Sequence, residues 1–254
     1  DWSSDVCSSD LPDIILAMGT DDSSISEMDK LQEILNIPVV MVDGDIRNTS
    51  ETYKFLGELF DNKERAHELI SYTEKVFGDV NEIVDKIPES ERVKIYYAAG
   101  PAGLETGLKG SGNTETIDIA GGNNVAVGPK EEAKGRTEVT MEQVLNWDPE
   151  LIIVVPSKST GVKSSYELIK TDESWQHIQA VKNGKVYETP YMPFNWFDKP
   201  PSINRLIGVK WLTYIMYPNE VNYDIKEEAK DFYDIFYHIN LTDEDLDIIL
   251  DNSI

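Results

Sequence analysis

The stretch "TMEQVLNWDPELIIVVP" (Thr140–Pro156) places a helix, a turn and a buried strand in immediate succession. Its last part is a short run of aliphatic residues, which is typical of a strand that is covered on both faces. Near the N-terminus, "PDIILAMG" (Pro12–Gly19) has the same order of proline, acid, apolar strand and loop. Because strand and helix signals alternate around both stretches, the sequence predicts parallel α/β units.

The other expected elements continue this alternation along the chain. Before the middle of the chain we expect a helix at 26–36 with Ser26 as its cap, a strand at 37–44 and a helix at 50–60. After it we expect a strand at 93–100, a helix at 113–122, a short helix, Asn-Gly turn and strand within 172–189, and a helix at 203–216. An acidic helical tail follows.

The segment Asn62–Ile87 differs from the others in its length. Apolar residues recur in it at spacings of three and four, which predicts one amphipathic helix of about 39 Å at about 1.5 Å per residue. Such a helix between two α/β halves would act as a stiff connector. The alternative is an ordinary amphipathic surface helix.

Charge and hydropathy exclude several classes of protein. The 254 residues carry a formal charge of −24, and clustered Lys and Arg of the kind that bind nucleic acid are lacking. No apolar run approaches the roughly 18 residues that a membrane span requires. With 40% hydrophobic residues, the chain is expected to be a soluble globular protein that is long enough for two modest cores.

The first eleven residues, "DWSSDVCSSDL", have a composition unlike the rest of the chain. One set of codons for this stretch reproduces a common short-read sequencing adapter, so we expect residues 1–11 to be translated adapter and the genuine chain to begin near Pro12. Cys7 is the only cysteine. The remaining chain therefore offers no disulfide, thiol nucleophile or cysteine ligand for a metal.

Residues for catalysis or for a resident cofactor are sparse. The three histidines, His67, His177 and His238, are scattered, so no serine has a positioned base and no transition metal has a ligand cluster. The glycine-rich stretch Gly107–Asn113 lacks the spacing of a nucleotide-binding loop. Its backbone amides could meet an anionic group of a ligand, or the glycines could serve only a turn that needs positive φ. We therefore expect no enzyme and no cofactor.

The most unusual stretch is "YMPFNWFDKPPSINR" (Tyr191–Arg205), directly after an expected strand. Phe194, Trp196 and Phe197 cannot all face one core, and the prolines stiffen the loop, so we expect rings that line a cleft. Ligands of α/β proteins bind beyond the carboxyl ends of parallel strands. Arg205 could pair there with a carboxylate or an oxyanion. The alternative is an aromatic plug that only stabilises the fold.

Three stretches together resemble a known family. These are "GPAGLETGLKGSGNTETIDIAGGNNVA", "TEVTMEQVLNWDPELIIVVP" and "PFNWFDKPPSINRLIGVKWL". They resemble the substrate-binding proteins of ABC importers for ferric-siderophore, haem and cobalamin complexes, and the resemblance runs from about Pro12 to Met216. It implies an α/β protein of two Rossmann-like lobes joined by one long rigid helix, with the ligand in the cleft between the lobes.

On this resemblance the chain divides into five segments. We expect adapter at 1–11, a partial N-terminal lobe at 12–61, the connecting helix at 62–87, the C-terminal lobe at 88–219 and a helical tail at 220–254. The N-terminal lobe would be incomplete, because the adapter stands where its first strand, an export signal and one docking glutamate of the family would lie.

The resemblance also implies a function and the residues that carry it. The protein would be an extracytoplasmic monomer, periplasmic or a membrane-anchored lipoprotein, that delivers a small metal chelate, such as an iron siderophore or haem, to an ABC permease. The family's "EQVL" motif maps its permease-docking glutamate onto Glu142. Aromatic side chains would enclose the ligand, Arg205 and Lys109 would answer its negative charge, and further polar contacts would come from the same loops. The expected ligand-binding residues are Tyr191, Phe194, Asn195, Trp196, Arg205, Lys109, Glu105 and Asn113.

Other ligands and other classes of protein stay open at this point. The cobalamin-binding relative has an acid at the position of Asn195, which weakens a corrinoid assignment. Family members that bind oxyanions such as molybdate would use Arg205 and helix amides. A two-domain α/β transferase would need paired carboxylates at strand ends, for which Asp43 and Asp45 are the near fit. A surface adhesin would bind no small ligand.

Overall fold

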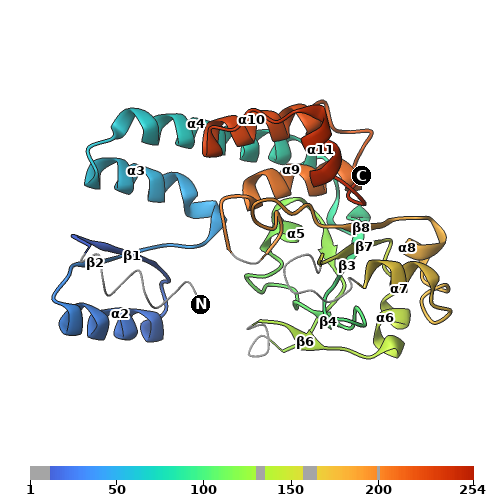
Figure 1. The fold of residues 1–254 in the computed structure, drawn as a ribbon. Helices are drawn as coiled ribbons and strands as arrows, with labels where there is room; N and C mark the ends of the chain where they lie inside the picture. Colours follow the sequence, from blue (N-terminus) through green and yellow to red (C-terminus); the bar gives the residue numbers. More distant parts are fainter. Residues whose placement is uncertain (1–11, 130–134, 157–164, 199–200) are drawn as a thin grey trace. The chain divides into compact units, whose positions relative to one another are not determined.

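The computed structural model describes residues 12–129, 135–156, 165–198 and 201–254. Its chain forms two compact units, residues 1–71 and residues 72–254, and the boundary falls inside helix α4 (Lys63–Val84). Figure 1 labels most of the helices and strands of both units. The expected adapter at residues 1–11 lies outside the described residues, and that expectation stays a prediction.

The first unit contains one parallel β-α-β arrangement. Strands β1 (Ile15–Met18) and β2 (Val39–Val42) pair in parallel, with Ile15 opposite Val39. Between them α2 (Asp22–Leu35) begins four residues earlier than the sequence predicted, because Asp21 caps it by accepting hydrogen bonds from the amides of Ser23 and Ser24. A short 3₁₀ helix, η1 (Ile46–Asn48), and α3 (Thr49–Leu59) follow.

Helix α4 is the longest helix of the described residues, with 22 residues. It begins and ends inside the predicted span of 62–87, so its length is about 33 Å at about 1.5 Å per residue rather than 39 Å. The part of α4 that belongs to the second unit buries Val76, Val80 and Ile83. These side chains continue the three-and-four spacing from which the helix was predicted.

The second unit is built around a parallel sheet with the strand order β5-β3-β7-β8. The strands are β3 (Lys94–Ala98), β5 (Asn123–Asn124), β7 (Leu151–Val154) and β8 (Val186–Glu188). Every residue of β7 is fully buried, which agrees with a strand covered on both faces. The predicted α/β class with parallel strands is confirmed.

Helices cover both faces of this sheet (Figure 1). Helices α6 (Met141–Trp147), α7 (Tyr166–Thr171) and α8 (Gln179–Lys182) contribute to the hydrophobic core on one face. On the other face α5 (Glu115–Ile119) packs against α9 (Arg205–Met216). A 3₁₀ turn, η2 (Glu89–Glu91), precedes β3, and β4 (Glu105–Thr106) and β6 (Thr137–Glu138) form a small antiparallel pair.

The C-terminal helices are part of the second unit and not a detached tail. Helix α10 (Ile225–Tyr237) lies against α9 (Figure 1), and α11 (Asp243–Ile249) follows it. The indole N–H of Trp211 on α9 donates to the carbonyl of Ser253 at 2.8 Å. Phe232 on α10 is fully buried. The acidic composition that predicted a tail belongs to the exposed faces of helices whose other faces are packed.

Candidate functional site

The loops that follow the parallel strands of the second unit form the candidate site. The loop after β3 leads through residues 99–104 into β4, and the loop after β8 holds residues 189–198, the aromatic loop. The carboxyl ends of parallel strands lie at one edge of a sheet, where α/β proteins bind ligands. Both loops, which belong to stretches that the sequence singled out, therefore lie at that edge.

A cavity of about 250 Å³ lies at the end of β3. Residues 99–102 and 104 form its wall together with Glu105, Glu138 and Val139. Glu105 and Glu138 stand directly opposite each other in the antiparallel β4-β6 pair, so the cavity carries two carboxylates. Gly100 has φ +74°, and a Cβ there would lie 2.5 Å from Oε1 of Glu105. The positive φ favours glycine at this position of the wall.

The side chain of Asn195 braces the aromatic loop from inside. Its Nδ2 donates to Oγ1 of Thr189 at 2.8 Å, and its Oδ1 accepts from the amide of Phe197 at 2.6 Å. Only 1% of Asn195 is exposed. The sequence predicted a ligand contact at this position. In the structure the asparagine instead supplies both a donor and an acceptor to the loop, which a carboxylate could not do.

Trp196 also differs from its expected role. The ring is fully buried, and its N–H donates to the hydroxyl of Tyr233 on α10 at 3.3 Å. Phe197 is buried as well, with its ring centroid 4.6 Å from that of Tyr97. A ring enclosed on all sides cannot stack on a ligand in this conformation, so both rings act as the aromatic plug that the sequence left open. Phe194 is 41% exposed, and Tyr191 is partly exposed.

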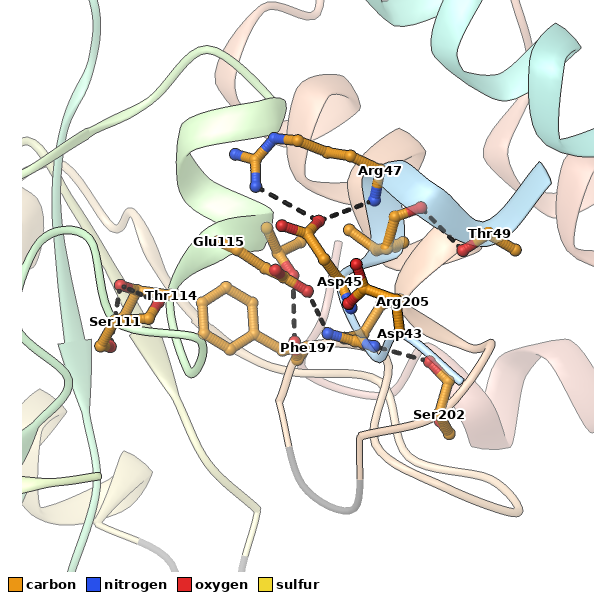
Figure 2. A network of polar contacts seen from close by, with 12 residues as sticks. Asp43, Asp45, Arg47, Thr49, Ser111, Thr114, Glu115, Phe197, Ser202 and Arg205 are labelled. Carbon is orange, nitrogen blue, oxygen red and sulfur yellow. Dashed lines mark hydrogen bonds and ion pairs between the residues drawn. The ribbon is translucent and has the colours of Figure 1, made fainter. Parts of the chain in front are cut away.

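Arg205, the expected partner of an anionic ligand, is already paired. Its guanidinium donates to Glu115, and its Nε donates to the carbonyl of Ser202 at 3.2 Å (Figure 2). The side chains of Arg205 and Glu115 are 8% and 10% exposed. The pairing satisfies the buried charge of Arg205. The sequence did not predict it, because the two residues lie 90 positions apart.

The sequence did not indicate a second arginine group, in which Arg136 is partly buried and Asp198 is buried. Nη2 of Arg136 lies 3.0 Å from both the hydroxyl of Tyr97 and Oδ2 of Asp198, and Tyr97 donates to the same carboxylate. Burial raises the pKa of Tyr97 well above its ordinary value, and Asp198 raises it further. Burial alone would lower the pKa of Arg136, but Tyr97 and Asp198 raise it overall. The arginine therefore stays charged and the tyrosine stays protonated.

The glycine-rich loop is held by its own side chains. Oγ1 of Thr114 donates to the carbonyl of Leu108 at 3.0 Å and lies 3.3 Å from Oγ of Ser111. Gly110 has φ +83°, which confirms the reading of this stretch as a turn that needs positive φ. Nδ2 of Asn113 is buried and has no hydrogen-bond partner within the described part of the chain. Lys109 is exposed, and its Nζ donates to the neutral side chain of Asn123 at 3.2 Å.

Glu142, the expected docking residue, is exposed in the first turn of α6. This helix begins with a capping box, in which Thr140 accepts from the amide of Gln143 at 3.2 Å and Gln143 accepts from the amide of Thr140 at 2.8 Å. The box fixes the backbone of the first turn, on which Glu142 lies. Among the described residues no ion pair involves Glu142.

The described residues offer neither a cluster of metal ligands nor a helix that could span a membrane. No group of three or more His, Cys, Asp or Glu side chains there is arranged to hold a metal ion. None of the helices in these residues combines the length and the apolar character needed to cross a bilayer.

Comparisons with known proteins find relatives along most of the chain. A solved ABC transporter solute-binding protein from Sulfurospirillum deleyianum is 34% identical, with a TM-score of 0.85, and the match covers 94% of this chain and 72% of that one. The molybdate-binding protein MolA of Haemophilus influenzae is 27% identical over 84% of this chain and 64% of its own length. The haem uptake protein IsdE of Staphylococcus aureus is 27% identical over 66% of this chain and 57% of its own length.

This chain thus spans less than two thirds of the length of either curated relative. The family model of periplasmic binding proteins matches residues 11–192, which is more than half of the chain and includes β3, the glycine-rich loop and the capped helix α6. The resemblance that the three sequence stretches predicted is therefore confirmed, and the chain belongs to the periplasmic binding protein family.

Proposed function

We propose that this protein is the extracytoplasmic binding component of an ABC importer and that it captures a metal chelate, an iron siderophore or haem, for delivery to the permease. It would act as a monomer and catalyse no reaction. Family membership and the similarity to a solute-binding protein of an ABC transporter support the importer role. The name of IsdE assigns haem to one relative.

The ion pairs of two arginines support a chelate as the ligand in preference to a bare oxyanion. Arg205 is paired with Glu115, and Arg136 is paired with Asp198. A guanidinium binds an oxyanion through charge-assisted hydrogen bonds, and one that is already paired with a carboxylate has less charge to offer. Phe194 is exposed at the same edge of the sheet and suits an apolar surface instead. Lys109 makes no ion pair with another described residue and would answer a residual negative charge on the chelate.

Permease docking would use Glu142. An exposed carboxylate on the ordered first turn of a capped helix is accessible for a charge-assisted contact with an arginine pocket of a partner. The role of Glu142 is carried over from the family's motif, and its exposure and its lack of an ion pair among the described residues support it.

An oxyanion is the second candidate ligand. MolA is named for molybdate and is 27% identical to this chain. A corrinoid has less support, because Asn195 is turned inward to brace the loop.

A ligand titration tests the proposal. Ferric protoporphyrin, a ferric tris-catecholate, cobalamin and molybdate are each titrated into the full chain, with heat and visible absorbance as readouts. We expect saturable binding of one of the two iron chelates and no heat from molybdate. Saturable binding of molybdate alone would replace the chelate by an oxyanion. Silence toward all four would contradict a binding function for this chain.

A further inference from the structure

Helix α10, which the sequence presented as a tail, supports the aromatic loop. We propose that Asn204, Tyr233 and Tyr237, the supporting triad, position this loop so that Met192 and Phe194 present a fixed apolar surface to the ligand. The inference rests on the proposed function and deepens it, because it assigns the ligand an apolar face and names the residues that meet it. None of the supporting triad was singled out by the sequence.

The aromatic loop sorts its side chains into two sets. Met192 and Phe194 are 48% and 41% exposed, whereas Asn195 and Trp196 are buried. Single exposed apolar residues are common on protein surfaces and need no explanation. Here, however, two of them lie two positions apart at the sheet edge where α/β proteins bind ligands. In addition, hydrogen bonds from buried side chains hold the backbone of both residues, which favours a specific role for their exposed side chains.

Asn204 is the central residue of the support. It directly precedes α9 and is fully buried. Its Nδ2 donates to the carbonyl of Phe194 at 3.1 Å and to that of Met192 at 3.4 Å. Its Oδ1 accepts a hydrogen bond from the hydroxyl of Tyr237 at 2.5 Å. The carbonyls of the two residues with exposed side chains are therefore both tied to one buried amide.

Tyr233 adds a second tie from α10. Its hydroxyl donates to the carbonyl of Met192 and accepts from the indole N–H of Trp196 at 3.3 Å. The rings of Tyr233 and Tyr237 pack with their centroids 5.4 Å apart. Burial raises the pKa of both hydroxyls above the ordinary value, so both keep the proton that they donate. The support is fully connected, with a partner for each polar group in use.

This arrangement has a consequence for binding. A loop that is already ordered loses little conformational entropy when a ligand binds to it. More of the free energy of contact with the exposed side chains therefore contributes to the affinity. Burying a Phe or Met side chain fully is worth about 1.5–3 kcal/mol. Met192 and Phe194 are already about half buried, so covering the rest is worth about half of that range, which corresponds to about threefold to tenfold in the dissociation constant. A bare oxyanion has no apolar surface that could make this contact with the two side chains.

The experiment compares two groups of variants in the full chain. Phe194→Ala and Met192→Ala remove the apolar surface, whereas Tyr233→Phe and Tyr237→Phe remove one supporting hydroxyl each. Tyr223→Phe is the matched control, because its hydroxyl donates to the carbonyl of Lys210 on α9 at 2.8 Å, outside the aromatic loop. The readouts are the dissociation constant for ferric protoporphyrin, or for the ferric tris-catecholate if only that binds, and the urea midpoint.

We expect Phe194→Ala to weaken chelate binding by about threefold to tenfold, and Met192→Ala to weaken it as well. Each supporting Tyr→Phe variant should weaken it by about threefold to tenfold, since one hydrogen bond is worth about 0.5–1.5 kcal/mol. Tyr223→Phe should bind like the wild type, with a urea midpoint shifted as much as those of the other two Tyr→Phe variants.

Three results would overturn the inference in different ways. If Phe194→Ala binds like the wild type, the apolar surface does not meet the ligand. If it loses affinity but both supporting variants match Tyr223→Phe, the triad stabilises the fold without positioning the loop. If the wild type binds neither iron chelate, the proposed function itself fails, and the inference falls with it.

Discussion

Arg205 and Glu115 form an ion pair in which both side chains are about nine-tenths buried. The arginine begins α9 and the glutamate begins α5, so the pair ties the starts of two packed helices together. A buried pair of this kind is costly to break, because the remaining partner is left as an uncompensated charge. The pairing therefore gives Arg205 a structural role, while the ligand contact expected from the sequence stays a prediction.

The first prediction follows from this pair. Glu115→Gln should lower the free energy of unfolding by about 3–5 kcal/mol, since it removes the carboxylate charge that the buried guanidinium of Arg205 pairs with. The double variant Glu115→Leu, Arg205→Met should lose less than the single variant, because neither charge remains. Urea unfolding of the single and double variants measures both values. A double variant that loses more stability than Glu115→Gln would contradict the coupling.

Lys210 on α9 gives the second prediction. Its side chain is fully buried, and its Nζ lies 2.7 Å from both Asp79 on α4 and Glu228 on α10. Lys210→Ala should destabilise the protein by about 3–5 kcal/mol, because it leaves the Glu228 carboxylate short of its buried partner. Lys230→Ala removes a lysine of α10 whose side chain is 31% exposed and pairs with Glu227 and Asp243. As the control, it should change the urea midpoint little.

The third prediction concerns transport. Glu142→Ala should leave the affinity for the chelate unchanged and weaken coupling to the permease by about tenfold, because it removes one exposed charge from the docking contact. Uptake of radiolabelled iron chelate by cells that carry the cognate permease measures the effect. Glu167→Ala is the control, since Glu167 is another exposed acid in the first turn of a helix, α7. Equal uptake with both variants would remove Glu142 from the docking surface.

The buried tyrosines predict a loss of stability at high pH. Burial is the largest cause that raises the pKa of Tyr96, Tyr97 and Tyr233 above the ordinary value near 10. Above about pH 10 the unfolded chain releases these protons while the folded chain retains them, so the free energy of unfolding falls as the pH rises. The stabilisation is fully present below that pH.

Absorbance at 295 nm and urea midpoints between pH 8 and pH 12 check this prediction. The absorbance should show an exposed class that titrates near pH 10 and a second class that titrates only as the protein unfolds. Smooth titration of all twelve tyrosines near pH 10 with an unchanged urea midpoint would contradict the burial argument.

The fold could be predicted from local patterns, because strands and helices leave their period in the sequence. The aliphatic run after Asp148 became β7, and the apolar residues of 62–87 became α4. The boundaries were less accurate where a side chain sets them, as Asp21 does for α2. Periodicity shows which residues can share a helix face. It does not show which side chain accepts the hydrogen bonds of the first backbone amides, and therefore it does not locate the start of the helix.

The site was less predictable, because its contacts join residues that are distant in the chain. The Arg136–Asp198 pair spans 62 positions and the Trp196–Tyr233 hydrogen bond spans 37. No local pattern marks such partners. The sequence showed that adjacent aromatic residues could not all face one core, but only the packing decides that Trp196 turns inward and Phe194 outward.

Gly208 provides the last prediction, and no local pattern in the sequence marked it. It lies inside α9, where alanine has a better intrinsic helix propensity than glycine by about 1 kcal/mol. A Cβ at Gly208 would nevertheless lie 1.7 Å from the carbonyl oxygen of Trp196, so the aromatic loop approaches α9 at a distance that only glycine allows. Gly208→Ala must push this backbone away, and overpacking of this kind costs about 1–3 kcal/mol or more. The substitution should therefore lower the urea midpoint and weaken chelate binding together, because it displaces the loop that Asn204 holds.

Gly78→Ala on α4 is the matched control, since a Cβ there meets no atom within 4 Å, and it should keep or raise the midpoint. A Gly208→Ala variant as stable as Gly78→Ala would mean that the loop does not rest against α9 as the structure places it.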